Sequence, residues 1–315
     1  MKAKINDIVR MVNVGTCSKP VDFSKIAALA KEDRMSPAEN DNTKVLLVGI
    51  DFQYCFIEDI GSLGVAGSKN DVRRTIAWLY RNCEKVTRVM LSADDHTMQQ
   101  IFFPCWWSDK RGNNPDPYTI ITHDDVVHEI WIPNYDKMIP DENNPGTMIS
   151  YSQEYVRHLE AGKRQKLQIW PYHATSGTFD SNIEAQLSAM VYYHARCRHN
   201  DPFIARKGTD PWSEMYSLIK PEWSMDGYIN MPVLSEFAKY DIIVFTGEAA
   251  SHCAGLSVLD TAEYFAQIGG RKPQLVVLRD CMSPIPGFED YTEGLYKTLQ
   301  EKYGVLVTRS KDFVL

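Results

Sequence analysis

Residues 241–268 decide the fold, and they read DIIVFTGEAASHCAGLSVLDTAEYFAQI. The opening DIIVFTG is apolar and β-branched, which is typical of a strand buried on both faces of a parallel sheet. The residues from His252 onward predict a helix, which Gly269 and Gly270 end. A buried strand that turns directly into a helix is half of a βαβ unit, so this stretch favours an α/β fold.

The same alternation recurs from residue 43 to the C-terminus. Further strands are predicted at 44–51, 86–96, 167–173, 201–208, 274–280 and 305–309. Further helices are predicted at 71–86, 150–162, 182–198, 232–240 and 291–304. This pattern predicts a mainly parallel sheet with helices on both faces. Ligands of such sheets bind beyond the carboxyl ends of the strands, so the residues that follow the strands are candidates for a site.

Two segments depart from the alternation. Residues 1–42 are mixed and polar, and we expect an N-terminal extension with one helix before a main domain at 43–315. An ordinary connection is a few residues long, so the segment at about 103–160 is predicted to be an insertion. It is either a surface subdomain or subunit contact, or a lid over the site. Its aromatic residues include Phe103, Trp106, Trp107, Tyr118, Trp131 and Tyr135.

Composition limits the possible partners. The chain has 315 residues, is 44% hydrophobic and carries a net charge of −7, which argues against general nucleic-acid binding. The N-terminal MKAKINDIVRMVNVG lacks the apolar region of a signal peptide. The longest apolar runs are strand-sized, whereas a membrane span needs about 20 residues. The cysteine count is odd and no CxxC pair occurs, which suits reduced thiols. We therefore expect a cytoplasmic protein with no membrane partner.

A cysteine, an acid and a lysine follow three of the predicted strands. Cys253 opens a helix, whose N-terminus lowers a thiol pKa and so favours the reactive thiolate. Asp51 ends the first strand and is a candidate general base. Lys207 is placed to stabilise a thiolate and the charge that develops during attack. Each has an ordinary alternative: a buried cysteine, an aspartate that caps a loop, and a solvated lysine.

A second group has the composition of a metal site. Asp94 and His96 are two residues apart in an extended segment, so both side chains can reach one ion. His173 is the third candidate, although a single histidine is more often an ordinary polar residue. Asp and His ligands with open coordination positions fit Zn²⁺, Fe²⁺ or Mn²⁺.

Together these motifs resemble the isochorismatase-like cysteine hydrolase superfamily, and within it the nicotinamidase (pyrazinamidase) branch. The resemblance covers roughly residues 44–102 and 165–312. The matching motifs are D-x-Q-x-x-F at Asp51, Gln53 and Phe56; K-G-x-D at Lys207, Gly208 and Asp210; the nucleophile turn from Gly247 to Cys253; D-x-H at Asp94 and His96; and W-P-x-H at Trp170 to His173. The chain departs from the family where Ala250 and Ser251 replace Thr and Asp, and where Ala174 replaces Cys.

The resemblance implies a three-layer α/β/α fold with a sheet of about six strands and an Asp51–Lys207–Cys253 triad. It implies a cis peptide at Glu248–Ala249 and an oxyanion hole formed by the backbone N–H groups of Ala249 and Cys253. It also implies that Phe56 and Trp170 wall the substrate pocket, that the metal holds a pyridine nitrogen, and that the protein is a homo-oligomer.

Three functions follow as alternatives. The first is metal-dependent hydrolysis of nicotinamide to nicotinate and ammonia. The second keeps the triad but acts on another small amide of the carbamoyl, ureido or maleamate type, often without a metal. The third is a catalytically silent binding or scaffold protein that uses the aromatic insertion.

Overall fold

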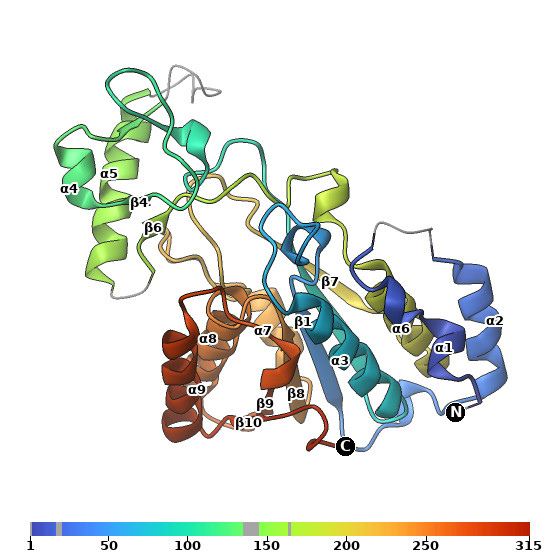
Figure 1. Ribbon diagram of the computed structural model, residues 1–315. Coiled ribbons are helices and arrows are strands. Elements are labelled where there is room, and N and C mark those ends of the chain that lie inside the picture. The colour runs from blue at the N-terminus through green and yellow to red at the C-terminus, as the bar shows by residue number, and fades with distance from the viewer. Residues whose placement is uncertain (1, 17–20, 135–144, 163–164) are drawn as a thin grey trace.

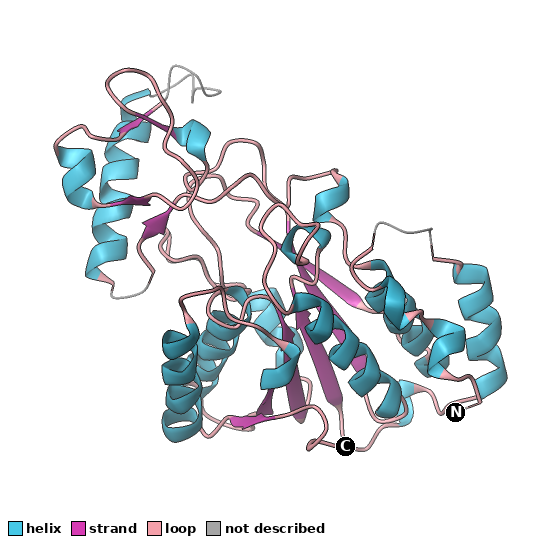
Figure 2. Cartoon of the chain, viewed as in Figure 1, coloured by secondary structure: helices cyan, strands magenta, loops and turns pink. Residues whose placement is uncertain are grey.

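The computed structural model describes residues 2–16, 21–134, 145–162 and 165–315. A six-stranded sheet lies at the centre, with the strand order β10-β9-β8-β1-β2-β7 (Figure 2). Every neighbouring pair in it is parallel, as the alternation of strands and helices predicts. The strands are β1 (Val45–Ile50), β2 (Arg88–Asp94), β7 (Phe203–Lys207), β8 (Ile242–Gly247), β9 (Gln274–Leu278) and β10 (Leu306–Thr308).

Helices cover both faces of this sheet, which confirms the three-layer prediction (Figure 1). One face carries α3 (Ser68–Arg81) and α6 (Ala185–Arg198), and the other carries α7 (Met231–Phe237), α8 (Cys253–Gln267) and α9 (Glu289–Tyr303). Successive side chains of β1 alternate between the two cores, because neighbouring residues of a strand face opposite ways. Within the described ranges, no helix combines the length and the apolar composition that crossing a membrane requires.

The N-terminal extension is more structured than its polar sequence predicts. It forms α2 (Phe23–Asp33), which is the one helix expected, and in addition the single-turn helix α1 (Ile5–Ile8), which was not predicted. Ile8, Ile26 and Ala30 are buried in the core that also contains α6. Short 3₁₀ turns lie at Met11–Asn13, Ala38–Asn40, Tyr54–Phe56, Pro104–Trp106, Phe179–Ser181 and Arg279–Cys281.

The insertion forms a lobe beyond one end of the sheet, drawn in green in Figure 1. It contains β3 (Trp107–Ser108), β4 (Ile120–Ile121), α4 (His123–Val127), β5 (Ile132–Pro133), α5 (Pro145–Ala161) and β6 (Leu167–Gln168). The strands pair antiparallel as β3 with β5 and β4 with β6. The short strand predicted within 167–173 is present as Leu167–Gln168, but it pairs with β4 and not with the main sheet, which corrects its predicted place. We call residues 103–168 the insertion lobe. Trp106 and Trp107 are buried, whereas Tyr135 lies outside the described residues.

Candidate active site

Three predicted side chains meet at the carboxyl edge of the sheet. Asp51 follows β1, Lys207 ends β7 and Cys253 begins α8 directly after β8, and all three are buried. Lys207 Nζ lies 2.9 Å from Asp51 Oδ2 and 3.6 Å from Cys253 Sγ. A carboxylate oxygen of Asp51 lies within 4.8 Å of the sulfur. The parallel topology thus gathers around one thiol residues that are between 46 and 202 positions apart in the sequence.

The conformation of Asp51 is fixed by its neighbour on β2. Its backbone has φ of 48°, in the left-handed region that Asp tolerates better than most residues. Ser92 Oγ donates to Asp51 Oδ1 at 2.5 Å and accepts from the Asp51 backbone N–H at 3.1 Å. These two bonds leave Oδ2 directed at Lys207.

Lys207 is shared between two buried carboxylates, because Asp94 Oδ1 also lies 2.5 Å from Nζ. Burial alone would lower the pKa of Lys207, but Asp51 and Asp94 raise it well above its ordinary value, so the side chain is an ammonium. Burial raises the pKa of Asp51 to about 6, although Lys207 opposes this shift. The carboxyl group thereby approaches the proton affinity suited to a base that works near neutral pH.

The pKa of the Cys253 thiol differs from the sequence prediction. Burial raises its pKa well above the ordinary value, and this effect outweighs the opposing charge of Lys207. The lowering of the pKa that the helix N-terminus predicts is therefore exceeded by the effect of burial at this site. The thiol instead rests in its neutral form beside a carboxylate that can accept its proton.

The turn before Cys253 presents unpaired backbone donors. Its Glu248–Ala249 peptide is cis, as expected. The N–H groups of Ala250 and His252 donate to the carbonyls of Ser283 and Ala249, at 2.8 and 3.0 Å. In the part of the chain that the structure describes, the N–H groups of Ala249 and Cys253 have no protein acceptor. These are the two donors predicted for an oxyanion hole, and both residues line the same pocket.

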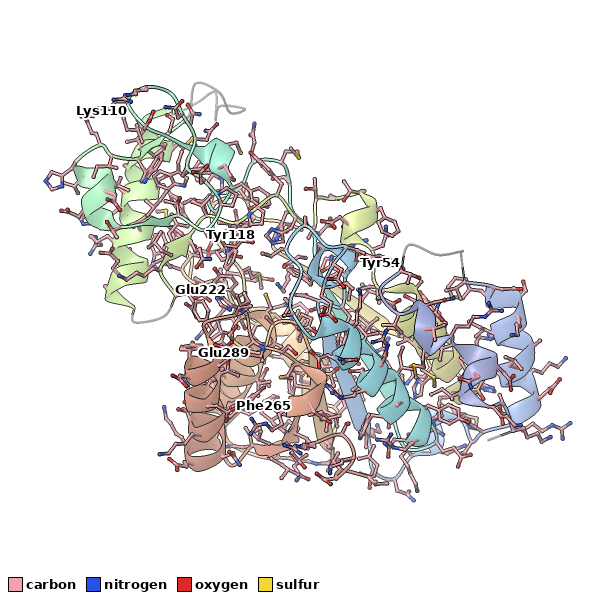
Figure 3. The ribbon with its side chains drawn as sticks, viewed as in Figure 1. Tyr54, Lys110, Tyr118, Glu222, Phe265 and Glu289 are labelled. Atoms are coloured by element: carbon pink, nitrogen blue, oxygen red, sulfur yellow. The ribbon has the colours of Figure 1, made fainter. Side chains whose placement is uncertain are left out.

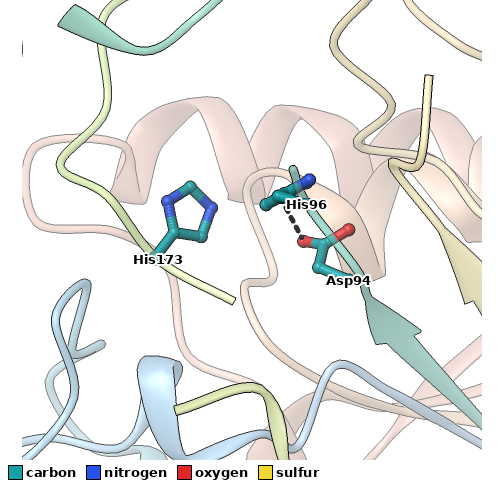
Figure 4. Close-up of side chains that lie close together, drawn as sticks. All are labelled: Asp94, His96 and His173. Carbon is teal, nitrogen blue, oxygen red and sulfur yellow. Dashed lines mark ion pairs between the residues drawn. The ribbon is translucent and has the colours of Figure 1, made fainter. Parts of the chain in front are cut away.

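Asp94, His96 and His173 converge next to the triad (Figure 4). One ligand atom from each lies within 4.8 Å of the others, and all three residues are buried. His96 Nδ1 lies 2.9 Å from the Gly208 carbonyl oxygen and His173 Nδ1 lies 2.8 Å from that of Pro171. A carbonyl only accepts, so each Nδ1 carries a proton, and in the neutral form of each ring Nε2 keeps a free lone pair.

These features fit a divalent metal ion. The Nε2 atom of His96 is buried without a hydrogen-bond partner, and Asp94 Oδ2 lies 3.6 Å from it. Burial lowers the pKa of His173 to about 3, which keeps it in the neutral form that binds metals. Histidines that bind metals usually donate their other ring N–H to a group such as a backbone carbonyl, which fixes the orientation of the ring.

A pocket opens onto Cys253. Phe56 and Trp170 lie on its wall as predicted, and the Trp170 Nε1–H donates to Tyr216 Oη at 2.9 Å. Tyr118, from the insertion lobe, packs edge-on against Trp170 at 6.1 Å between ring centroids (Figure 3). The lobe therefore supports one wall of the pocket. The full lining is Phe56, Leu63, Val65, Asp94, Trp170, His173, Glu214, Tyr216, Ala249, His252, Cys253 and Ile285.

Two polar residues of this lining were not predicted. Glu214 is buried beside Asp94 and His96, and burial raises its pKa to about 8. His252 directly precedes Cys253, and this position next to the nucleophile could have predicted that it lines the pocket. No comparable signal marks Glu214, because its placement depends on the path of the loop after Lys207.

Comparisons with known proteins support the fold. No protein-family model matches the chain, and no curated protein matches it in sequence. Among solved structures, it resembles the Acinetobacter baumanii nicotinamidase (TM-score 0.56, 18% identity, covering 87% of this chain and 100% of that one). It also resembles the yeast nicotinamidase bound to nicotinaldehyde (0.57, 18%, 84% and 99%). A third similar structure is the Pyrococcus horikoshii pyrazinamidase in complex with zinc (0.50, 15%, 84% and 98%). The chain thus has the fold of the nicotinamidases.

Proposed function

We propose that this protein is a metal-dependent cysteine amidohydrolase that converts nicotinamide, or a close heteroaromatic amide, into the acid and ammonia. The observation that carries the proposal is the position of Lys207 Nζ, 2.9 Å from Asp51 Oδ2 and 3.6 Å from Cys253 Sγ. A buried base, cation and thiol at the end of a small pocket are the groups that nucleophilic attack on an amide requires. The shared fold with nicotinamidases supports the choice of substrate.

The residues supply each proton and charge of the reaction. Asp51 accepts the proton of Cys253, and the sulfur attacks the amide carbon to form a tetrahedral oxyanion. The N–H groups of Ala249 and Cys253 bind that oxyanion, while Lys207 balances the negative charge. Asp51 then returns the proton to the leaving nitrogen, and the C–N bond breaks to release ammonia and leave a thioester. A water molecule, deprotonated by Asp51, attacks the thioester, and the acid leaves as the thiol is restored.

Asp94, His96 and His173 would hold the metal ion, and zinc is the proposed ion because its ligands include Asp and His. The zinc complex of the pyrazinamidase from P. horikoshii supports this choice, and Fe²⁺ and Mn²⁺ are the alternatives. When bound, the ion supplies a Lewis-acidic position for a ring nitrogen of the substrate. Phe56 and Trp170 would hold the ring beside it by stacking. A cytoplasmic location, homo-oligomeric assembly and the absence of nucleic-acid or membrane partners stay predictions from the sequence.

Ammonia release from nicotinamide, compared with a panel of carbamoyl, ureido and maleamate-type amides, tests the proposal. Cys253→Ala is expected to reduce the rate by at least roughly 10³-fold, because the nucleophile is lost. Cys105→Ala removes a half-buried thiol outside the pocket lining and is expected to keep full activity. Persistent activity in Cys253→Ala would show that the nucleophile is misassigned. Ligand-induced thermal shifts without turnover of any amide by the wild-type protein would instead support a silent binding protein.

A further inference from the structure

His252 occupies the pocket wall between the oxyanion turn and the nucleophile. Only 3% of its surface is exposed, and it lines the same pocket as Cys253. Its ring makes edge-on contacts with Trp170, Tyr216 and Phe288 at centroid distances of 5.8, 5.1 and 4.8 Å. The imidazole thus belongs to the wall that would face the body of a bound substrate.

The hydrogen bonds of Ser251 determine which nitrogen of His252 carries the proton. Ser251 Oγ accepts from the Ile285 backbone N–H at 3.1 Å and lies 2.8 Å from His252 Nδ1. Among the described residues, the Ser251 hydroxyl has no other hydrogen-bond acceptor, so we assign Nδ1 as the acceptor of its hydrogen. Because Nδ1 accepts, the proton of the neutral imidazole is on Nε2.

The imidazole is neutral, and its Nε2–H is unused by the protein. Burial lowers the pKa of His252 to about 4, so the ring is uncharged at neutral pH. No acceptor for Nε2–H occurs in the described ranges, and the atom is not among the fully enclosed polar atoms that lack a partner. An unsatisfied donor in an apolar pocket favours a ligand that supplies an acceptor at that point.

We propose that His252 is a specificity-determining residue whose Nε2–H binds a second hydrogen-bond acceptor on the substrate. The acceptor is a ring nitrogen, carbonyl or carboxylate oxygen on the body of the molecule, since the scissile carbonyl is assigned to the N–H groups of Ala249 and Cys253. This inference rests on the proposed amidase function and deepens it: small amides that carry two acceptor groups besides the scissile amide are expected to be preferred over those that carry one. One of these would face the Asp94, His96 and His173 cluster and the other His252. Ser251 acts as the positioning residue that fixes the tautomer.

The test compares nicotinamide with pyridine-3,5-dicarboxamide, which adds a second carbonyl acceptor. In the wild type, kcat/KM is expected to favour the dicarboxamide. His252→Phe, which keeps an aromatic ring but removes the donor, is expected to lower that preference, measured as the ratio of the two kcat/KM values, about 10-fold to 100-fold. His252→Gln, which retains an N–H donor, is expected to restore part of the preference. Equal losses for both amides in His252→Phe would show a merely structural role and overturn the inference.

Binding to Cys253→Ala, measured by calorimetry with the same two amides, separates this inference from the proposed function. If selective binding depends on His252 but the wild type turns over neither amide, the amidase proposal fails and the donor assignment stands. If the wild type turns over both amides with no preference that depends on His252, the donor assignment fails and the amidase proposal stands. Absence of both binding and turnover would overturn both.

Discussion

Replacing Lys207 with Met should destabilise the protein strongly and in a pH-dependent way. The side chain of Lys207 has no exposed surface, and it is paired with Asp51 and Asp94 at 2.9 and 2.5 Å. Removing one partner of a buried ionic network leaves the remaining charges uncompensated and typically costs about 3–5 kcal/mol in unfolding free energy. Methionine has a similar length, so the loss of packing is small and the effect reports on charge.

The sign of the pH dependence follows from the two carboxylates. Without Lys207, burial and mutual repulsion raise the pKa of both above the values of the unfolded chain. Both groups are then protonated in the folded and unfolded states below about pH 4, where the variant is least impaired. The penalty grows as the pH rises toward neutrality, because the unfolded chain releases protons that the folded protein retains.

Urea unfolding from pH 4 to 8, in the presence of a chelator, measures this effect. The matched control is Lys110→Met, because Lys110 and its ion-pair partner Glu129, at 3.0 Å, are both exposed. An exposed pair contributes up to about 1 kcal/mol, so this variant should lose little stability at any pH. Equal stability losses in the two variants at pH 7, or a Lys207→Met penalty that shrinks as the pH rises, would refute the reasoning.

Three further predictions concern the metal cluster, the oxyanion turn and the insertion lobe. His173→Ala should weaken zinc binding by at least about 10-fold in a competition assay with a chromogenic chelator, since the loss of a residue that only orients a metal ligand already costs that much, whereas His128→Ala, just after α4, should not. Burial raises the pKa of Glu248 well above its ordinary value, so wild-type stability should fall as the pH rises above about 4.5. Glu248→Gln should flatten this dependence of stability on pH in urea titrations. An unchanged dependence would contradict the raised pKa of Glu248. Tyr118→Ala removes an aromatic contact with Trp170 and should raise KM by about 3-fold to 10-fold with little change in kcat. Its control is Ile120→Ala, at an exposed position of β4, and equal effects of the two substitutions would argue against support of the pocket wall by Tyr118.

The main sheet was predictable because each of its strands has a local sequence signal. Each core strand is an apolar run with a turn or an acid at its end, and the alternation with helices leaves few topologies. The place of the strand within 167–173 was not predictable, because its pairing is not local. Only Leu167–Gln168 is a strand, and its partner β4 comes from the insertion. The additional short helix of the N-terminal extension was not predictable for a related reason. The few apolar residues of the extension are buried in the core that contains α6.

The positions of the site residues were predictable, but their electrostatics were not. The position of Cys253 at a helix N-terminus suggested a lowered thiol pKa, whereas its burial raises the pKa. Burial depth is a property of the assembled pocket, to which the insertion lobe contributes, and no local pattern encodes it. The same holds for His252, whose tautomer depends on Ser251 and the distant Ile285 backbone.

The sequence also separated two groups of residues that the structure joins. Asp94 was assigned to the metal cluster and Lys207 to the triad, yet the two residues are paired in the register of β2 with β7 and their side chains lie 2.5 Å apart. Asp94 therefore contributes to two networks, because its other oxygen lies 3.6 Å from His96 Nε2. Any substitution of Asp94 would alter the charge that Lys207 shares with Asp51 as well as the ligand set. Loss of activity in such a variant could not be attributed to metal binding alone. His173 forms no hydrogen bond or ion pair with Lys207 in the described structure, and it is therefore the cleaner site at which to test the metal.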